Sequence, residues 1–309
     1  MYDGIINVYK EKGYTSHDVV AKMRGILKMK KIGHTGTLDP QAEGVLPVCI
    51  GKATKLVDLI TDKEKTYEAV MRLGITTDTQ DMTGTVIKSL KVNVGLEATR
   101  EAVSGFIGGY DQLPPMYSAI KVNGKKLYEL ARQGKEVERK KRRVEIRDIK
   151  ILHFDDQKHE ATILVECGKG TYIRTLIHDI GIKLGCGASM KDLTRRAVGS
   201  FCLEDALYLS EIEKMAHDGR LEEHILPVDK VFEQYEKLTV GRDFDKLLHN
   251  GNVFYAKHLD AISAKQAQMP ADEGKTEEWF RVYDSDDIFV GIYRYDGTED
   301  CYRPVKMFL

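Results

Sequence analysis

The chain has 309 residues, of which 42% are hydrophobic and 31% are charged, and its net charge is −1. This length fits one large domain plus a smaller one, and the hydrophobic content supports a sizeable core. No segment approaches the roughly 18 consecutive apolar residues of a membrane span, and the N-terminal segment lacks the apolar run of a secretory signal. We therefore expect a cytoplasmic protein that does not enter a membrane.

Hydrophobic periodicity predicts helices and strands at several places along the chain. In chain order they are a helix over 16–28 with Ser16 as N-cap, a strand over 66–74, a strand over 160–168 and a helix over 171–184. From about residue 245, NGNVFYAK (250–257) and the segment 279–309 indicate short strands with acidic turns. We expect a mixed α/β domain over 1–240 and a small all-β domain over 241–309.

Cysteine and histidine spacing argues against bound metals. The five cysteines are scattered without a CxxC pair, which indicates reduced thiols rather than a disulfide framework or a zinc site. The nine histidines form no HExxH pair, so we expect no metal. CIGKAT (49–54) and GKGTYIR (168–174) fail the spacing of a phosphate-binding loop and of a dinucleotide fingerprint, so we expect no cofactor.

Charge is distributed unevenly in spite of the overall balance. Residues 117–147 contain eleven Lys and Arg, with the run RKKRR at 139–143, and only four Glu, which gives a net charge of +7. Few large apolar residues occur there, so we interpret the block as a protruding insertion between strands. A basic run is often only a solvated face. In a chain of balanced charge, however, a block this basic favours a surface for a polyanion.

The segment KIGHTGTLDPQAEGVLPVCIGKATK (31–55) surrounds Asp39 with glycines and prolines. Gly33 and Gly36 allow the backbone to bend closely past another group, and Pro40 fixes the exit from the turn. An Asp-Pro pair alone is usually just a turn. A rigid carboxylate in a glycine-rich loop is also what covalent or acid–base chemistry requires.

This segment and four others together resemble the TruB family of tRNA pseudouridine synthases. The matching segments are GHTGTLDPQAEGVLPVCIGKATK (33–55), KTYEAVMRLGITTDTQDMTG (65–84), PPMYSAIKVNGKKLYELARQG (114–134), GTYIRTLIHDIG (170–181) and CGASMKDLTRRAVGSF (186–201). They stand in the family's order and span most of residues 4–230, so the match is specific. Gln41 and Glu43 depart from the family pattern beside Asp39.

The resemblance implies a fold and an activity. The fold would be a catalytic domain with a mainly antiparallel sheet and flanking helices, a thumb-like insertion at about 117–147, and a PUA-like β domain over 241–309. That last region has a net charge of −4, which is unexpectedly acidic for an RNA-binding module. The activity would convert the T-loop uridine at position 55 of tRNA to pseudouridine. The enzyme would act as a monomer on the T arm, without metal or cofactor, after flipping the base out.

The resemblance also assigns roles to individual residues. Asp39 would be the nucleophile and Arg174 the arginine that pairs with it, keeping it ionised and fixing its rotamer. Tyr67 would stack on the target base and act on the C5 proton, although its apolar strand neighbours also suit a plain core tyrosine. His34 would occupy the place that the base leaves, and Leu193 would line the uracil pocket.

Four more residues complete the predicted substrate-binding set: Tyr172 in the GTYIR segment, and the basic residues Lys141, Arg142 and Arg143. A carboxylate suits the chemistry, because it can attack C1′ of the ribose or C6 of the base and then leave again.

The residues leave other functions open. A non-catalytic RNA-binding or tRNA-folding factor could use the same groove and would not need Asp39. A base-excising glycosidase would use a second carboxylate such as Glu43 as an acid, and would release free uracil. A guide-RNA-directed relative would share the chemistry, but the chain shows none of the long extensions that we expect of one.

Overall fold

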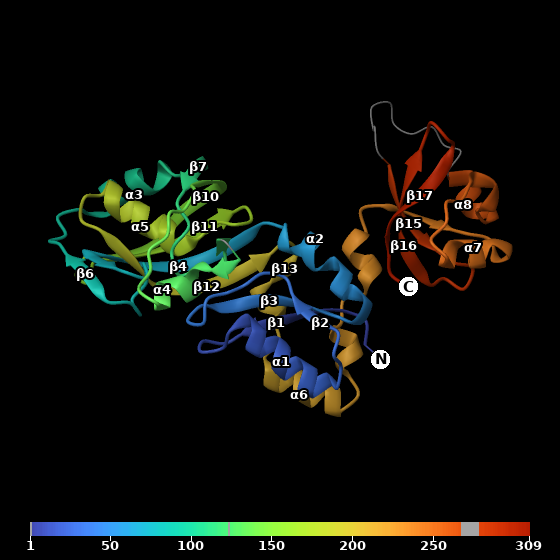
Figure 1. Ribbon diagram of the computed structural model, residues 1–309, viewed down its shortest axis with the longest axis horizontal. Helices are drawn as coiled ribbons and strands as arrows, with labels where there is room; N and C mark the ends of the chain where they lie inside the picture. The colour runs from blue at the N-terminus through green and yellow to red at the C-terminus, as the bar shows by residue number, and fades with distance from the viewer. Residues whose placement is uncertain (1, 123, 267–277) are drawn as a thin grey trace.

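The computed structural model describes residues 2–122, 124–266 and 278–309. Within these residues the larger part of the chain forms one nine-stranded sheet (Figure 1). Its main path runs through β1 (Gly4–Lys10), β3 (Glu43–Ile50), β12 (Ala188–Val198), β4 (Lys65–Leu73), β11 (Glu160–Cys167), β10 (Arg142–Asp155) and β7 (Gly108–Gln112). Two short strands extend it, β2 (Ile32–His34) on β3 and β13 (Phe201–Cys202) on β12. The predicted mixed α/β domain with a mainly antiparallel sheet is confirmed.

The strands follow from alternating hydrophobicity. In β4 every second side chain is buried, Tyr67 among them, as the period of a strand requires. The predicted strands over 66–74 and 160–168 thus correspond to β4 and β11. The one parallel pair on the main path joins β12 to β3 over only two residues of each strand, Thr194 with Glu43 and Arg195 with Gly44. This short contact divides the sheet into two halves.

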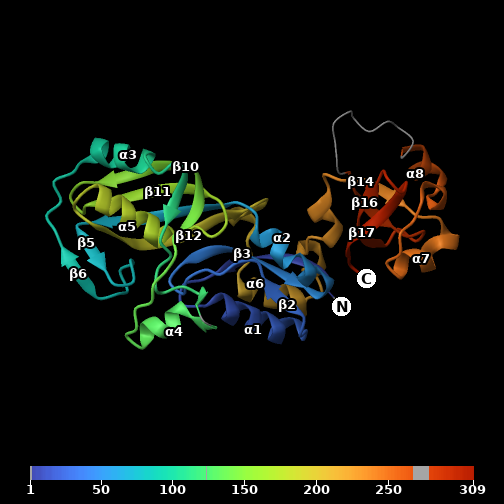
Figure 2. The same ribbon diagram turned by 45° about the horizontal axis from the view of Figure 1, so that its top comes forward.

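Each half of the sheet has its own helices and core. α3 (Leu96–Ser104) and α5 (Ile173–Lys183) pack on the half that contains β4, β11 and β10. α1 (Ser16–Leu27) and α6 (Leu209–His217) pack against β1 and β3 in the other half (Figure 2). The helix predicted over 171–184 corresponds to α5, which is three residues shorter. The predicted N-cap of α1, Ser16, is the first residue inside that helix. Thr15 caps that helix, because Asp18 completes a capping box with it.

Short elements connect these parts of the larger domain. They are α2 (Val57–Thr61) after β3, and the hairpin of β5 (Ile75–Thr77) and β6 (Val86–Ser89) after β4.

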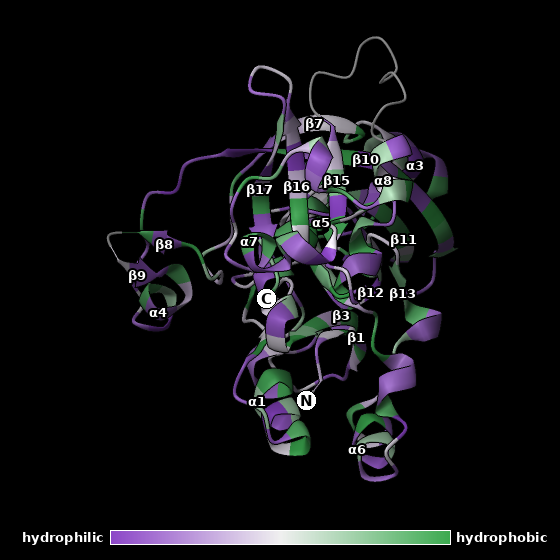
Figure 3. Cartoon of the chain, turned by 90° about the vertical axis from the view of Figure 1, so that its right-hand side faces the viewer, coloured by the Kyte–Doolittle hydropathy of each residue, from purple (hydrophilic) through white to green (hydrophobic). Residues whose placement is uncertain are grey.

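Residues 113–141 leave the sheet between β7 and β10, and we call this segment the excursion. It contains β8 (Lys121–Val122), β9 (Lys125–Lys126) and α4 (Leu127–Arg132), which stand away from the body of the molecule (Figure 3). The predicted insertion over 117–147 extends too far, because residues 142–147 belong to β10, where residues 142–146 pair with β7. The protruding part of the basic block is therefore shorter than the charge pattern indicated.

The C-terminal part forms a second, four-stranded sheet at one end of the molecule (Figure 1). Its order is β14 (Glu236–Thr239), β15 (Trp279–Tyr283), β16 (Phe289–Asp296) and β17 (Cys301–Met307). The predicted small C-terminal β domain is confirmed. It also carries two short helices, α7 (Asp245–His249) and α8 (Ala261–Gln266). The strand predicted over 250–257 is wrong, since only Phe254 forms an isolated bridge, to Tyr302.

The two sheets share a hydrophobic contact. Ile292 and Phe308 of the C-terminal part are buried in one cluster with Ile5, Val45 and Cys49 of the larger sheet. The five cysteines are free thiols. In the part of the chain that the structure describes, no helix is long and apolar enough to cross a membrane, and no three His, Cys, Asp or Glu side chains gather as metal ligands.

Candidate active site

The loop between β2 and β3 carries Asp39, and hydrogen bonds to neighbouring elements hold this loop. We call residues 35–42 the catalytic turn, after the role predicted for Asp39. Thr35 donates from both its N–H and its hydroxyl to the Pro47 carbonyl, at 3.1 and 3.0 Å. Gly36 has φ +120°, a conformation that L side chains rarely adopt. The N–H of Leu38 donates to Ser16 Oγ at 2.9 Å. These contacts fix the backbone on the N-terminal side of Asp39.

Lys10 holds the other side of the turn from beneath. Its side chain is 0% exposed, and its Nζ donates to the carbonyls of Ala42 at 2.6 Å and Pro40 at 3.3 Å. Burial lowers the pKa of Lys10 to about 8, and the charge of Asp39 partly opposes that shift. Lys10 was not among the site residues predicted from the sequence. Its signal is a lysine at an inward position of the apolar alternation in β1.

Asp39 and Arg174 come together across 135 positions of sequence. Arg174 Nε donates to Asp39 Oδ2 at 2.8 Å, and Nη2 donates to Oδ1 at 3.1 Å. The side chain of Arg174 is 4% exposed and that of Asp39 is 38% exposed. A bidentate pair of this kind fixes the rotamer of the carboxylate. Asp39 is therefore held on one side and accessible on the other.

Arg174 also binds two further loops. Its Nη1 donates to the Thr79 carbonyl at 3.0 Å, and its Nη2 donates to the Tyr117 carbonyl, in the excursion, at 2.8 Å. Asp81 Oδ2 lies 3.9 Å from Nη1, and Asp81 is itself held by the N–H of Thr83 at 2.9 Å. Two carboxylates thus face one buried guanidinium. Asp81 lies in the segment 65–84 that carries the family resemblance, but its contact with Arg174 was not predicted from the sequence.

Tyr67 and Leu193 lie beside this pair on neighbouring strands. Both are buried in one cluster with Leu38, the residue before Asp39, and Tyr67 is 8% exposed. Burial raises the pKa of the Tyr67 phenol, the charge of Arg195 opposes that shift, and the charge of Asp39 adds to it. The tyrosine is therefore close enough to Asp39 to sense its charge.

Tyr172 connects this region to β7 and β10. Its N–H donates to Gln112 Oε1 at 2.8 Å, and its carbonyl accepts from Gln112 Nε2 at 3.0 Å. Burial raises the pKa of the Tyr172 phenol, and the charges of Arg142 and Arg174 lower it. Arg142, which is exposed and pairs with Gln112 across the strands, therefore lies on the side of the sheet that faces the site.

The other two predicted basic residues are placed differently. Arg143 follows Arg142 in β10, so its side chain points to the opposite face. There it pairs with Asp111 at 3.8 Å. Lys141 is exposed at the end of the excursion. It lies near Asp179: burial raises the pKa of the Asp179 carboxyl to about 6, and the positive charge of Lys141 partly opposes that shift. Lys141 and Arg142 therefore lie near Asp179 and Tyr172, whereas Arg143 lies on the opposite face of β10.

His34 ends β2 at the entrance to the catalytic turn. Its ring meets that of His17 edge-on, with centroids 5.1 Å apart. Burial lowers the pKa of His34, and the charges of His17 and Arg195 lower it further. At neutral pH the imidazole is therefore uncharged.

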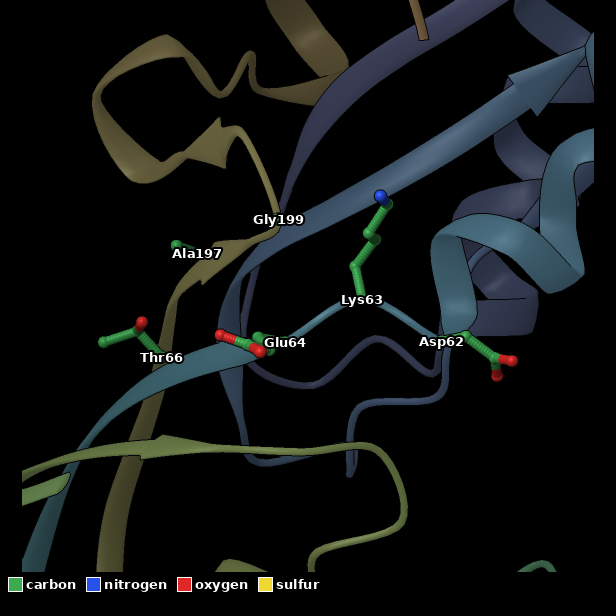
Figure 4. A pocket seen from close by; sticks show the side chains of 6 residues that line it. All are labelled: Asp62, Lys63, Glu64, Thr66, Ala197 and Gly199. Atoms are coloured by element: carbon green, nitrogen blue, oxygen red, sulfur yellow. The ribbon is translucent and has the colours of Figure 1, made fainter. Parts of the chain in front are cut away.

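A separate surface hollow lies away from these residues. It is lined by Asp62, Lys63, Glu64, Thr66, Ala197 and Gly199 (Figure 4). None of the predicted site residues is among those that line it. The candidate site is therefore defined by the contacts around Asp39 rather than by this hollow.

Solved structures share the overall fold. A chain from "Structure of H/ACA RNP bound to a substrate RNA containing 2'-deoxyuridine" superposes with a TM-score of 0.70 at 24% identity, covering 99% of this chain and 85% of that one. A chain from "Crystal Structure of a Cbf5-Nop10-Gar1 Complex" gives a TM-score of 0.70 at 26% identity, with the same coverage. The fold is that of the pseudouridine synthases.

Sequence comparisons narrow this class to one family. The model described as TruB family pseudouridylate synthase (N terminal domain) matches residues 24–173, and that of the tRNA pseudouridylate synthase B C-terminal domain matches 174–233. A relative from Lachnoclostridium phytofermentans named tRNA pseudouridine synthase B is 54% identical over 99% of this chain and 100% of its own length. One of the same name from Clostridium perfringens is 41% identical over 95% of both chains. The chain belongs to the TruB family of pseudouridylate synthases.

Proposed function

We propose that this chain converts the T-loop uridine at position 55 of tRNA to pseudouridine, with Asp39 as the nucleophile. Its family and the shared name of its relatives make it a tRNA pseudouridine synthase. The role of Asp39 is supported by one observation above all. Its carboxylate accepts two hydrogen bonds from the buried Arg174, while the Asp39 side chain is still 38% exposed.

The proposed chemistry needs few groups. The uracil is detached from C1′, rotated and rejoined through C5, so that no atom is lost. Asp39 would attack C1′ or C6 and leave again, with Arg174 holding it in place. Tyr67 would lie against the base and act at C5, Leu193 would line the uracil pocket, and Tyr172 would stand at its edge.

The base must leave the RNA stack before it can reach Asp39. We propose that the uncharged ring of His34 takes its place there, since a flat ring can stack on the bases that remain. The position of His34 at the entrance to the catalytic turn supports this role.

The excursion and Arg142 would bind the T arm. Most of the cations between 121 and 143 are exposed, so they can contact phosphates. Such contacts depend on salt and read the shape of the RNA rather than its base sequence. Every residue proposed for the site comes from one chain, so we propose that the enzyme is a monomer. We also propose that it acts on tRNA in the cytoplasm. Sedimentation of the enzyme alone and with tRNA tests its oligomeric state.

Mapping pseudouridine in an unmodified tRNA transcript tests this function. Wild-type protein should form pseudouridine at position 55 only, and Asp39→Asn should bind the transcript yet form none. A transcript with cytidine at position 55 is the matched RNA control. Equal product from Asp39→Asn would refute the role of Asp39. Binding without product by the wild type would indicate a folding factor, and release of free uracil would indicate a glycosidase.

A further inference from the structure

Arg195 lies where the two halves of the large sheet meet. It belongs to β12 and stands opposite Tyr67 of β4 on one side and Gly44 of β3 on the other. Its side chain is 1% exposed and is among the largest fully buried side chains of the described residues. β12 passes so close to Gly44 that a Cβ there would lie 2.3 Å from the Arg195 carbonyl oxygen.

The guanidinium of Arg195 extends beneath the catalytic turn. Its Nε donates to the Val45 carbonyl at 2.7 Å, and its Nη1 lies 3.7 Å from the position that a Cβ on Gly36 would take. Among the described residues, Nη2 is buried without a hydrogen-bond partner, and the two carboxylates of the site, Asp39 and Asp81, pair with Arg174 instead. A buried charge without a counter-ion is costly. Its presence here therefore calls for a specific function.

Tyr67 is one of the groups on which this charge acts, beside His34, Lys10 and Lys65. Tyr67 faces Arg195 across the two strands; burial raises the pKa of its phenol, whereas the charge of Arg195 lowers it. A guanidinium can only donate hydrogen bonds, so the phenol oxygen is the acceptor when Nη2 of Arg195 binds it. The phenol O–H is then left to point away from Arg195.

We propose that Arg195 is a positioning residue for Tyr67. By donating to the phenol oxygen, it fixes the ring beneath the target base and turns the phenol O–H toward that base. This inference rests on the proposed function, in which Tyr67 contacts the flipped uracil. Arg195 itself does not touch the substrate, and it acts only through the tyrosine that faces it across β12 and β4.

A double-mutant cycle tests this role, because residues that act through one contact have non-additive effects. The variants are Arg195→Lys, Tyr67→Phe and the double variant, assayed by single-turnover pseudouridine formation in tRNA. Lysine keeps the charge but lacks the planar fork that reaches both the Val45 carbonyl and the phenol oxygen. We expect Arg195→Lys to slow the reaction roughly 10²-fold with Tyr67 present. In the Tyr67→Phe background we expect it to add less than about a twofold further loss.

Arg196 provides the matched control. It is the next residue in β12, is half-exposed, and pairs with Glu204 at 2.9 Å and Glu68 at 3.5 Å. Arg196→Lys should leave the single-turnover rate within about twofold of wild type, because exposed ion pairs contribute little. tRNA affinity and the melting temperature are measured for every variant.

The outcomes separate this inference from the proposed function. An equal loss of rate from Arg195→Lys in both backgrounds would overturn the inference, because it would make Arg195 a purely structural residue. If Arg195→Lys unfolded the protein or weakened tRNA binding equally in both backgrounds, that result would also overturn the inference. If the wild type itself formed no pseudouridine, the proposed function would fail instead. A loss that disappears in the Tyr67→Phe background supports the inference.

Discussion

The catalytic turn and the excursion are two loops built in opposite ways. The turn, residues 35–42, is fastened by the buried donor Lys10 and the hydroxyl of Ser16. The excursion, residues 113–141, carries elements that stand away from the sheet (Figure 3), and most of its lysines and arginines are exposed. Chemistry needs a group held within about 0.5 Å, whereas phosphate binding works through exposed charge at longer range. Arg174 contacts both loops, through Asp39 and the Tyr117 carbonyl.

Breaking the fork of Arg174 should give the largest effect on chemistry. Arg174→Lys keeps a positive charge but cannot hold both oxygens of Asp39 and two carbonyls. We expect kcat to fall on the order of 10²- to 10³-fold, with tRNA affinity within about threefold of wild type. Arg100→Lys, in an exposed pair on α3, is the control and should have no effect. A wild-type kcat for Arg174→Lys would show that the pair is not needed.

The two neighbouring arginines of β10 test the binding side of the comparison. Arg142 faces the site and Arg143 pairs with Asp111 on the opposite face. Arg142→Glu should weaken tRNA binding by about 10-fold or more at low salt, and reduce the salt slope of log K by about 1. Arg143→Glu should have a smaller effect. tRNA binding of both variants, measured from about 50 to 200 mM salt, distinguishes the two residues. Equal losses of affinity for Arg142→Glu and Arg143→Glu would contradict this assignment of faces.

Removing the hydroxyl of Ser16, which helps to hold the turn, should have a smaller effect than the changes at Arg174 and Arg142. Ser16→Ala leaves the buried N–H of Leu38 without its acceptor. We expect stability to fall by about 1–3 kcal/mol, and the single-turnover rate by several-fold, as Asp39 becomes less well held. Thermal melting and rate are compared with Ser210→Ala, an exposed serine on α6. An unchanged rate would show that the turn holds its shape without this bond.

Lys10 should give the smallest effect at neutral pH and a distinct signature in alkali. Its folded pKa is lowered to about 8, against 10.5 for a lysine side chain in water. Between these values the unfolded state binds more protons, so stability gains up to about 1.4 kcal/mol per pH unit from this group as pH rises. Lys10→Met should lose that increment. Denaturant unfolding of both proteins between neutral pH and about pH 10 measures it, and parallel curves would contradict the lowered pKa.

The sequence predicted those features that depend on neighbouring residues. Periodicity located β4, β11 and α5, because each has one apolar face over eight or more residues. The N-cap of α1 was missed by one position, because Thr15 and Ser16 are both capable caps and Asp18 decides between them. The strand predicted over 250–257 failed because only Phe254 pairs, with Tyr302, and the chain then turns into a short 3₁₀ helix over Ala256–His258.

The parts of the site that the sequence did not predict depend on distant contacts. Lys10 reaches a carbonyl 32 positions away, Arg174 one that is 95 away and Arg195 one that is 150 away. The acceptors are backbone carbonyls, which every residue has, so no side-chain pattern marks them. The resemblance to a family indicated Asp39 and Arg174, but not the groups that hold them.

Single-turnover release of the C5 hydrogen from uridine-labelled tRNA tests the central claim most directly. The wild type and Asp58→Asn, an exposed carboxylate on α2, should release it at the same rate. Asp39→Asn should bind the same tRNA with similar affinity and release it at least about 10⁴-fold more slowly. Release by Asp39→Asn at a rate near that of wild type would show that another group performs the chemistry.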